Sequence, residues 1–259
     1  MKKQNFLFTL FIGLSILSCS SDDNGQKDIP IEIVKLYKKT LVYNNGNISF
    51  DKEVFYNDEN KIKSITINDY NYLSRTFTVS YNRNNISSII QNTNFDNPNN
   101  ADNSVTYNVT LENNKATLVS TANNSLLEIF FTNGYVDSTK FTFDTSSPTN
   151  YSEEVFTRDS NQNLISNSTG TETFTYSNFD SNKENDPFGG AMEYEYGDYF
   201  DILGLKVTKN NPLTGNYKQG STNDTWNIYL EYDKNGFVTK STREPNSITY
   251  YEEHHYIEL

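Results

Sequence analysis

The chain has a single cysteine and only two histidines among its 259 residues. Cys19 has no partner for an intramolecular disulfide. His254 and His255 are neighbours, and neighbouring strand residues point to opposite faces, so the two cannot share a metal or a catalytic site. Nothing in the sequence marks a histidine placed between a nucleophile and an acid. We therefore expect neither an enzyme nor a cofactor.

Basic residues are also scarce. Lysine and arginine together number 21 against 33 acidic residues, which gives a net charge of −12, and removal of Lys2 and Lys3 would make it more negative. Proteins bind nucleic acid mainly by neutralising phosphates with lysine and arginine. The composition therefore argues against a nucleic-acid partner and against docking onto anionic lipid headgroups.

One uncharged apolar run stands out, from Phe6 to Leu17, directly after Lys2 and Lys3. As a helix this run reaches only about 18 Å, whereas the hydrocarbon core of a bilayer is about 30 Å thick. A short apolar core behind a basic end is typical of a secretion signal. The sequence predicts that residues 1–18 are a lipoprotein signal peptide.

The sequence Ile16-Leu17-Ser18-Cys19 that ends this run resembles the lipobox of bacterial lipoproteins. In a lipobox the cysteine thiol is acylated, with palmitate-like chains, and the bond before it is cut. The alternative is an ordinary secretory cleavage site beside an unpaired cysteine. One acyl chain binds a membrane marginally and two or more bind it stably. We predict that Cys19 is lipidated and that the membrane is a partner through this lipid.

The residues after Cys19 are small and acidic. Ser20, Ser21, Asp22 and Asp23 resemble the export signal that sends Bacteroidota lipoproteins to the outer leaflet of the outer membrane. Alternatively, these residues only make the chain soluble at this point. Residues 19–30 are polar and lack periodicity, which indicates a flexible acidic tether. The expected location is the outer membrane, lipid-anchored and facing the cell exterior.

From residue 31 onward, apolar and polar residues alternate with a period of two, as in Phe77-Thr78-Val79-Ser80-Tyr81. Such alternation puts one face of a strand in a core and the other in water. The breaks between runs are rich in Asn, Asp and Gly, which suit tight turns. No long stretch has the 3.6-residue period of a helix. Residues 31–259 are predicted to be one all-β, antiparallel domain.

The runs also repeat, about every 20 to 30 residues, as an apolar residue, a polar turn and another apolar residue. Clear copies begin at Tyr81, Phe131 and Tyr232. Such a period predicts a meander of stacked hairpins, each of which buries its face against its neighbours.

These units resemble degenerate YD repeats, in which a Tyr precedes an Asp-x-x-Gly turn. The whole mature chain resembles Bacteroidota lipoproteins of unknown function that carry such hairpins (DUF4595-like). The segment from Tyr176 to Phe188 is similar to their late Tyr, Asp and Asn-Pro-Phe motif, with Asp186 inserted. The resemblance implies an open, strongly twisted or rolled sheet with a short irregular or helical insert near residues 188–205. It implies no activity.

Three groups of residues are candidates for sites. Oxygen-bearing side chains alternate from residue 180 to 186 as in calcium loops, but the glycine and the final glutamate of such a loop are missing, which favours a plain turn. Aromatic residues beside acidic ones could stack on a sugar, although Tyr and Trp in alternating strands are more often core. Asp137-Ser138-Thr139 resembles a short O-glycosylation motif of Bacteroidota. The candidates are Asp180, Asn182, Glu184 and Asp186 for a metal, Tyr194, Tyr196, Tyr199 and Trp226 for a ligand, and Ser138 and Thr139 for a glycan.

The sequence thus predicts a lipid-anchored surface protein whose β domain has a non-catalytic binding or scaffolding role. The alternative is a glycan-binding or glycan-degrading accessory protein of a polysaccharide uptake system. An association with an envelope protein is a third hypothesis.

Overall fold

A computed structural model describes residues 35–70, 72–96, 102–180, 196–244 and 250–258. Within these residues the chain forms sixteen strands and one short helix. The elements are β1 (Lys35–Asn44), β2 (Asn47–Tyr56), β3 (Ile62–Asp69), β4 (Leu73–Asn82), β5 (Asn85–Phe95), β6 (Asn103–Glu112), β7 (Lys115–Ser120), β8 (Leu126–Thr132), β9 (Tyr135–Thr142), β10 (Tyr151–Arg158), β11 (Leu164–Ser168), β12 (Glu172–Phe179), α1 (Gly197–Leu203), β13 (Pro212–Gln219), β14 (Thr222–Tyr232), β15 (Val238–Glu244) and β16 (Tyr250–Glu258).

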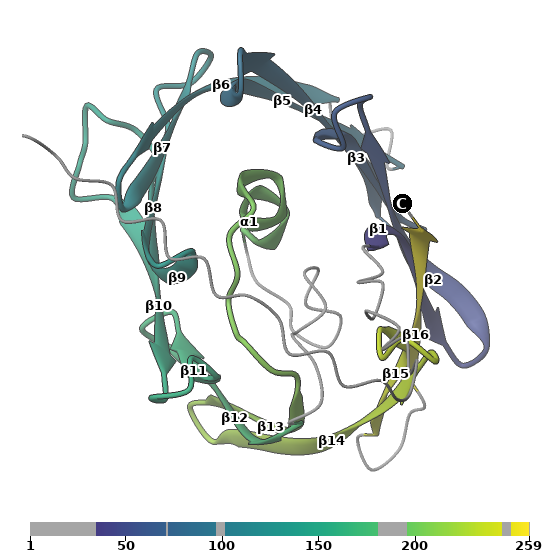
Figure 1. The fold of residues 1–259 in the computed structure, drawn as a ribbon. Helices are drawn as coiled ribbons and strands as arrows, with labels where there is room; N and C mark the ends of the chain where they lie inside the picture. The colour runs from purple at the N-terminus through teal and green to yellow at the C-terminus, as the bar shows by residue number, and fades with distance from the viewer. Residues whose placement is uncertain (1–34, 71, 97–101, 181–195, 245–249, 259) are drawn as a thin grey trace, which may run out of the picture. The chain divides into compact units, whose positions relative to one another are not determined.

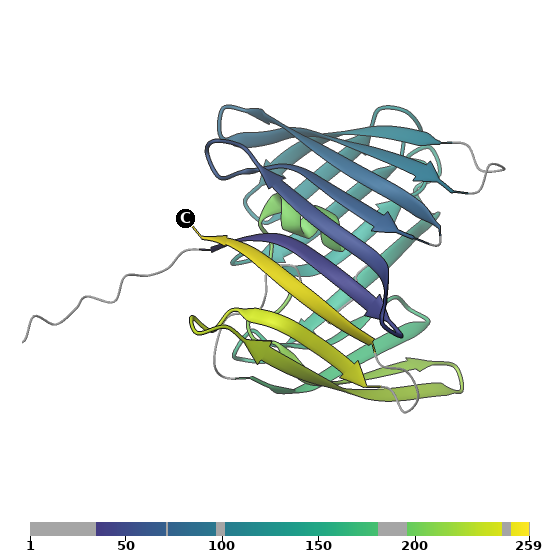
Figure 2. The ribbon, with the colours of Figure 1, turned by 90° about the vertical axis from the view of Figure 1, so that its right-hand side faces the viewer.

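The strands close into a barrel (Figures 1 and 2). Each strand pairs with its neighbours in sequence, and β1 pairs antiparallel with β16, with Leu41 opposite Glu253. The predicted all-β hairpin meander is confirmed, but the predicted open sheet is wrong. Alternation of apolar and polar residues is the same in open and closed sheets. Closure depends on the pairing of β1 with β16, which joins the two ends of the domain and cannot be predicted from a local sequence pattern.

The sequence repeat corresponds to hairpins that all lie at one end of the barrel. The repeated residues Tyr81, Phe131 and Tyr232, and Tyr56 in the equivalent position of β2, each stand at or next to the end of an even-numbered strand, so one repeat is one up-and-down strand pair. At each of them the strand register shifts by one residue. Such bulges bend a strand and increase its twist. A recurring bulge therefore helps a long meander curl far enough to close.

Local chemistry explains the turns at this end. Asn57, Asp159 and Asp233 each accept hydrogen bonds through Oδ1 from the backbone N–H groups two and four residues further on, at 2.8–3.0 Å. This is the way Asn and Asp side chains stabilise tight turns. The predicted role of Asx-rich breaks as turns is confirmed, and Asn133-Gly134 adds a two-residue turn with positive φ at both positions.

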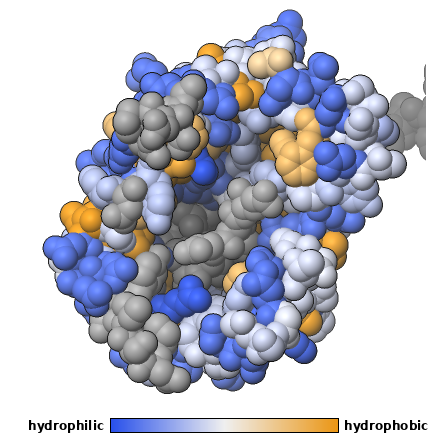
Figure 3. Space-filling view, turned by 180° about the vertical axis from the view of Figure 1, so that it is seen from behind, coloured by the Kyte–Doolittle hydropathy of each residue, from blue (hydrophilic) through white to orange (hydrophobic). Residues whose placement is uncertain are grey.

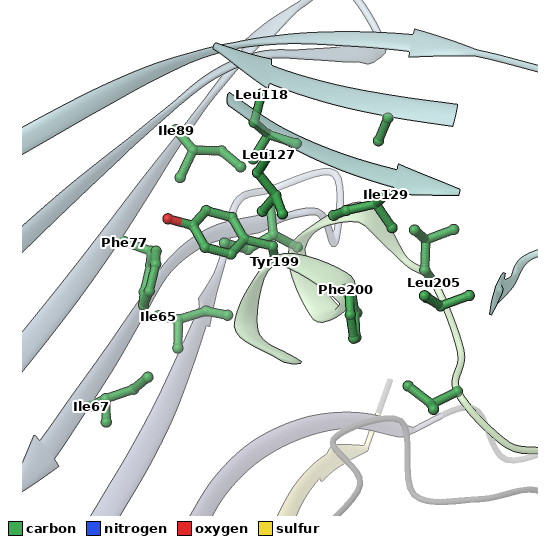
Figure 4. Packing of buried hydrophobic residues seen from close by; sticks show 14 of the residues in the cluster. Ile65, Ile67, Phe77, Ile89, Leu118, Leu127, Ile129, Tyr199, Phe200 and Leu205 are labelled. Carbon is green, nitrogen blue, oxygen red and sulfur yellow. The ribbon is translucent and has the colours of Figure 1, made fainter. Parts of the chain in front are cut away.

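The interior of the barrel is largely apolar and contains α1 (Figures 1 and 4). Inward side chains such as Ile65, Phe77 and Leu118 are almost fully buried, and Phe200 of α1 packs among them. The helix ends at Gly204, which adopts the left-handed conformation. The predicted insert near residues 188–205 thus contains a helix, while residues 188–195 lie outside the described part of the chain.

The outward side chains of the barrel wall are mostly polar. Across β4, β5 and β6 the outward rows in register are Thr76, Asn92 and Ser104, then Thr78, Ile90 and Thr106, then Ser80, Ser88 and Asn108. Across β8, β9 and β10 one outward row is Glu128, Lys140 and Glu153. Figure 3, which views the molecule from behind Figure 1 and so from the other end of the barrel, shows hydrophilic residues over most of the described surface there, with apolar residues in small separate patches.

Candidate functional site

Two ionic contacts fix α1 inside the barrel. Lys52 of β2 points inward, and its Nζ lies 2.7 Å from Asp198 Oδ1 and 2.5 Å from Asp201 Oδ2. Burial alone would lower the pKa of Lys52, but the two carboxylates outweigh it and raise that pKa above its ordinary value. The ammonium group is therefore charged at neutral pH, and it ties the helix to the wall.

Tyr199 of α1 belongs to the core. Its ring meets Phe77 and Tyr107 edge to face, and its hydroxyl donates a hydrogen bond to Gln91 Oε1 at 2.5 Å. Burial, with the neighbouring Tyr107, raises its pKa above the ordinary value of tyrosine. Tyr199 is therefore not a stacking surface for a ligand. The half-buried Tyr196 stacks on Phe141, with ring centroids 5.9 Å apart.

Four polar side chains line the interior where β15, β16 and β1 meet. We call Thr40, Ser241, Glu252 and His254 the inner polar cluster; each is at most 6% exposed. His254 Nδ1 lies 2.9 Å from Thr40 Oγ1, and Ser241 Oγ donates to Glu252 Oε2 at 3.3 Å. Alternation correctly places His254 and His255 on opposite faces, and the face that carries Glu252 and His254 is the interior.

The inner polar cluster does not have the geometry of a nucleophile–base–acid relay. In such a relay the nucleophile and the acid bond to opposite ring nitrogens of the histidine. Here Ser241 Oγ, at 3.5 Å, and Glu252 Oε2, at 3.7 Å, both lie beside His254 Nε2, while Thr40 occupies Nδ1. This arrangement is a buried hydrogen-bond network.

A second inward feature is the Trp226–Arg243 pair on β14 and β15. The Arg243 guanidinium lies 3.8 Å from the centroid of the Trp226 ring, which is a cation–π contact. The other side of the indole lies against Gly215 of β13, where a Cβ would come within 2.3 Å of Cε2. The indole Nε1–H is buried without a hydrogen-bond partner, a state that costs about 1–3 kcal/mol.

A third group lies on β9, β10 and β11. Thr139, Glu154 and Asn167 are at most 3% exposed, and Asn167 Nδ2 donates to Glu154 Oε1 at 2.7 Å. Thr139 Oγ1 and Asn167 Oδ1 have no hydrogen-bond partner. Buried polar atoms are rarely left unpaired, so each such atom needs an explanation.

The structure separates the residues that the sequence singles out. Asp180 is buried, and Asn211 and Tyr232 donate hydrogen bonds to it, so its oxygens support the entry of β13. Ser138 is half-buried on the outer face of β9, whereas Thr139 faces inward and is fully buried. Trp226 is 4% exposed. The other candidates lie outside the described residues: Cys19, Ser20, Ser21, Asp22, Asp23, Asn182, Glu184, Asp186 and Tyr194.

Sequence reasoning missed Arg243, Glu154 and Asn167 as inward residues. The signal available was the alternation of β15, which puts Arg243 on the same face as Ser241. Because both faces of this strand carry polar residues, alternation alone cannot say which face is buried.

The fold and the interior define a class, an up-and-down β-barrel with an internal helix and a partly polar interior. No family model and no curated protein matches the chain. It is similar to two solved porin-like proteins, one from Bacteroides uniformis ATCC 8492 and one from Bacteroides vulgatus ATCC 8482. The first has 10% identity and a TM-score of 0.43, and the match covers 85% of this chain and 98% of that one. The second has 11% identity and a TM-score of 0.47, with 86% and 99% covered. At TM-scores this low, the class rests on the strand pairing of the chain itself.

Within the described part of the chain, no helix is long and apolar enough to cross a membrane. No group of three or more His, Cys, Asp or Glu residues in that part could hold a metal ion.

Proposed function

We propose that this chain is a lipid-anchored outer-membrane protein whose barrel stands in water at the cell surface and binds a small polar ligand in its interior, without catalysis. The observation that carries the binding role is the set of buried, unpaired polar atoms on inward side chains: Trp226 Nε1, Thr139 Oγ1 and Asn167 Oδ1. A ligand that bonds to Trp226, or to the Thr139 and Asn167 group, would remove the cost of leaving those atoms unpaired.

Two features favour a binding barrel over a membrane channel. A barrel that crosses a bilayer presents an apolar band to the lipid and a polar interior. Here the outward rows on β4–β6 are hydroxyls and amides except for Ile90, while the interior holds the apolar core. In addition, Lys52 and Gln91 hold α1 inside the barrel. A lipid on Cys19 would supply the membrane attachment that such a wall cannot.

The anchor is tested by mass spectrometry of the N-terminal peptide from the protein expressed in a Bacteroidota host. We expect residues 1–18 to be absent and Cys19 to carry acyl chains. Protease shaving of intact cells should remove the wild-type barrel, and Asp22→Ala/Asp23→Ala should protect it. An unmodified Cys19 would contradict the anchor, and unchanged shaving would contradict the export signal.

The binding role is tested on the Cys19→Ala protein by thermal shift against a library of sugars and small organic acids. Thr139→Val removes an unpaired buried hydroxyl, so it should stabilise the unliganded protein by about 1 kcal/mol and reduce the shift produced by a ligand. Thr157→Val, on an exposed outward position of β10, is the matched control and should change neither. A library without any hit would count against a ligand in the interior.

A further inference from the structure

We infer that Trp226 and Arg243 form an oxyanion site inside the barrel, which binds a carboxylate of the ligand. This inference rests on the proposed binding role and names the chemistry of one part of it. Both residues lie on neighbouring strands, β14 and β15, and Trp226 packs with the inward-facing core.

The indole can offer a ligand only its edge. One side lies against Gly215, because a Cβ there would sit 2.3 Å from Cε2 and 2.6 Å from Nε1. The other side carries the Arg243 guanidinium at 3.8 Å from the ring centroid. No face remains for a sugar ring to stack on. What remains is the Nε1–H donor, which is buried and has no partner.

Arg243 adds a positive charge beside this donor. No carboxylate of the described residues lies within ion-pair distance of its guanidinium, and its one described interaction is with the indole. Glu252, the inward acid on the adjacent β16, is instead beside Ser241 and His254. Stacking uses the face of the guanidinium and leaves its N–H groups free in the plane, where they can form paired bonds to a carboxylate.

The charge of the molecule selects among oxyanions. With a net charge of −12 the protein repels anions from a distance. A singly charged carboxylate is repelled less than a dianionic phosphate, and its planar shape fits a guanidinium edge. The carboxylate can belong to an acidic sugar or to a small organic acid, since both present the same group.

The chain contains a single tryptophan, so the indole N–H signal in 15N-correlated NMR comes from Trp226 alone. The Cys19→Ala protein is titrated with galacturonate, acetate, galactose and inorganic phosphate. We expect a saturable shift with galacturonate, none with galactose, and a weaker response to phosphate. A comparable response to acetate assigns the site to free carboxylic acids, and a response to galacturonate alone assigns it to acidic sugars.

Arg243→Gln keeps a planar polar group but removes the charge, and should weaken carboxylate binding by about ten-fold or more. Lys240→Gln, an outward position on the same strand, is the matched control and should bind as wild type. The wild-type NMR titration decides the outcome even if Arg243→Gln fails to fold. The inference is overturned if neither carboxylate shifts the signal, if galactose shifts it equally, if phosphate binds more tightly, or if Arg243→Gln binds as wild type. A ligand that stabilises Arg243→Gln as much as wild type would leave the proposed binding role standing and remove only the carboxylate site.

Discussion

At the scale of single residues, Gly215 decides where the only tryptophan lies. A methyl group at this position would overlap the indole, with contacts of 2.3–2.6 Å. We predict that Gly215→Ala displaces Trp226 and destabilises the barrel by about 1–3 kcal/mol, as overpacking does. Urea unfolding gives the stability, and the tryptophan emission should move to longer wavelength as the ring gains water.

The control for this prediction is Lys218→Ala, an exposed position on the same strand. It should change the stability by no more than about 0.5 kcal/mol. Wild-type stability and an unchanged emission maximum in Gly215→Ala would mean that the indole does not depend on this glycine.

The sequence predicts which residues share a face better than it predicts which face is buried. Period two correctly separates His254 from His255, because backbone pleating alone determines it. It does not reveal that Glu252 and His254 lie inside, since burial depends on the barrel closing around them. Tyr199 is the opposite case. Its acidic and aromatic surroundings in the sequence suggest an exposed ligand surface, but the Tyr199 ring packs in the core against Phe77 and Tyr107.

At the scale of elements, α1 depends on a buried ion pair. We predict that Lys52→Met destabilises the protein by about 3–5 kcal/mol, because it removes the cation that contacts the carboxylates of Asp198 and Asp201. Adding Asp198→Asn and Asp201→Asn should recover much of the loss, because the two carboxylates that Lys52 neutralises are then uncharged as well. Urea unfolding measures both effects.

The matched comparison is Lys61→Met, which breaks the ion pair with the 66% exposed Glu59. Solvent-exposed pairs contribute about 0–1 kcal/mol, so this change should be small. Equal losses in the two lysine variants would contradict the anchoring role of Lys52.

The hairpins are the elements that the sequence predicts well, because their turns are local. In the turn after β14, Asp233 Oδ1 accepts hydrogen bonds from the N–H groups of Asn235 and Phe237, and Gly236 supplies the positive φ, so all the stabilising groups lie within five residues. The helical insert is also predictable, although from the family resemblance and not from a local pattern. Its location inside a barrel is not, because the contacts from Asp198 to Lys52 and from Tyr199 to Gln91 join residues more than 100 positions apart in the chain.

At the scale of the whole molecule, buried tyrosines predict the response to alkali. Burial raises the pKa of Tyr199 and Tyr81, and burial together with Asp180 raises that of Tyr232. These groups hold their protons longer in the folded than in the unfolded chain, so the stability is complete below about pH 10 and falls as the pH rises further. The urea midpoint should stay constant up to about pH 10 and drop between about pH 10 and pH 12. Part of the tyrosinate absorbance should appear only with unfolding, and ionisation of all tyrosines in the folded barrel would contradict this.

Closure of the barrel can be tested through the pairing of its first and last strands. Leu41 and Glu253 lie opposite each other on β1 and β16, at the separation of about 4.5–5.5 Å that antiparallel partners have and that a disulfide can span. In a Cys19→Ala background, Leu41→Cys/Glu253→Cys should therefore oxidise within one molecule and run faster on a non-reducing gel. Leu41→Cys/Tyr229→Cys is the control, because β14 lies three strands from β1, about 14 Å away. In an open meander β1 and β16 would be opposite edges, and the first pair would stay reduced or link separate molecules. If only Leu41→Cys/Glu253→Cys gives a fast-running monomer, the barrel is closed in solution. The same closure places Thr40 of β1 beside His254 of β16 and so completes the inner polar cluster.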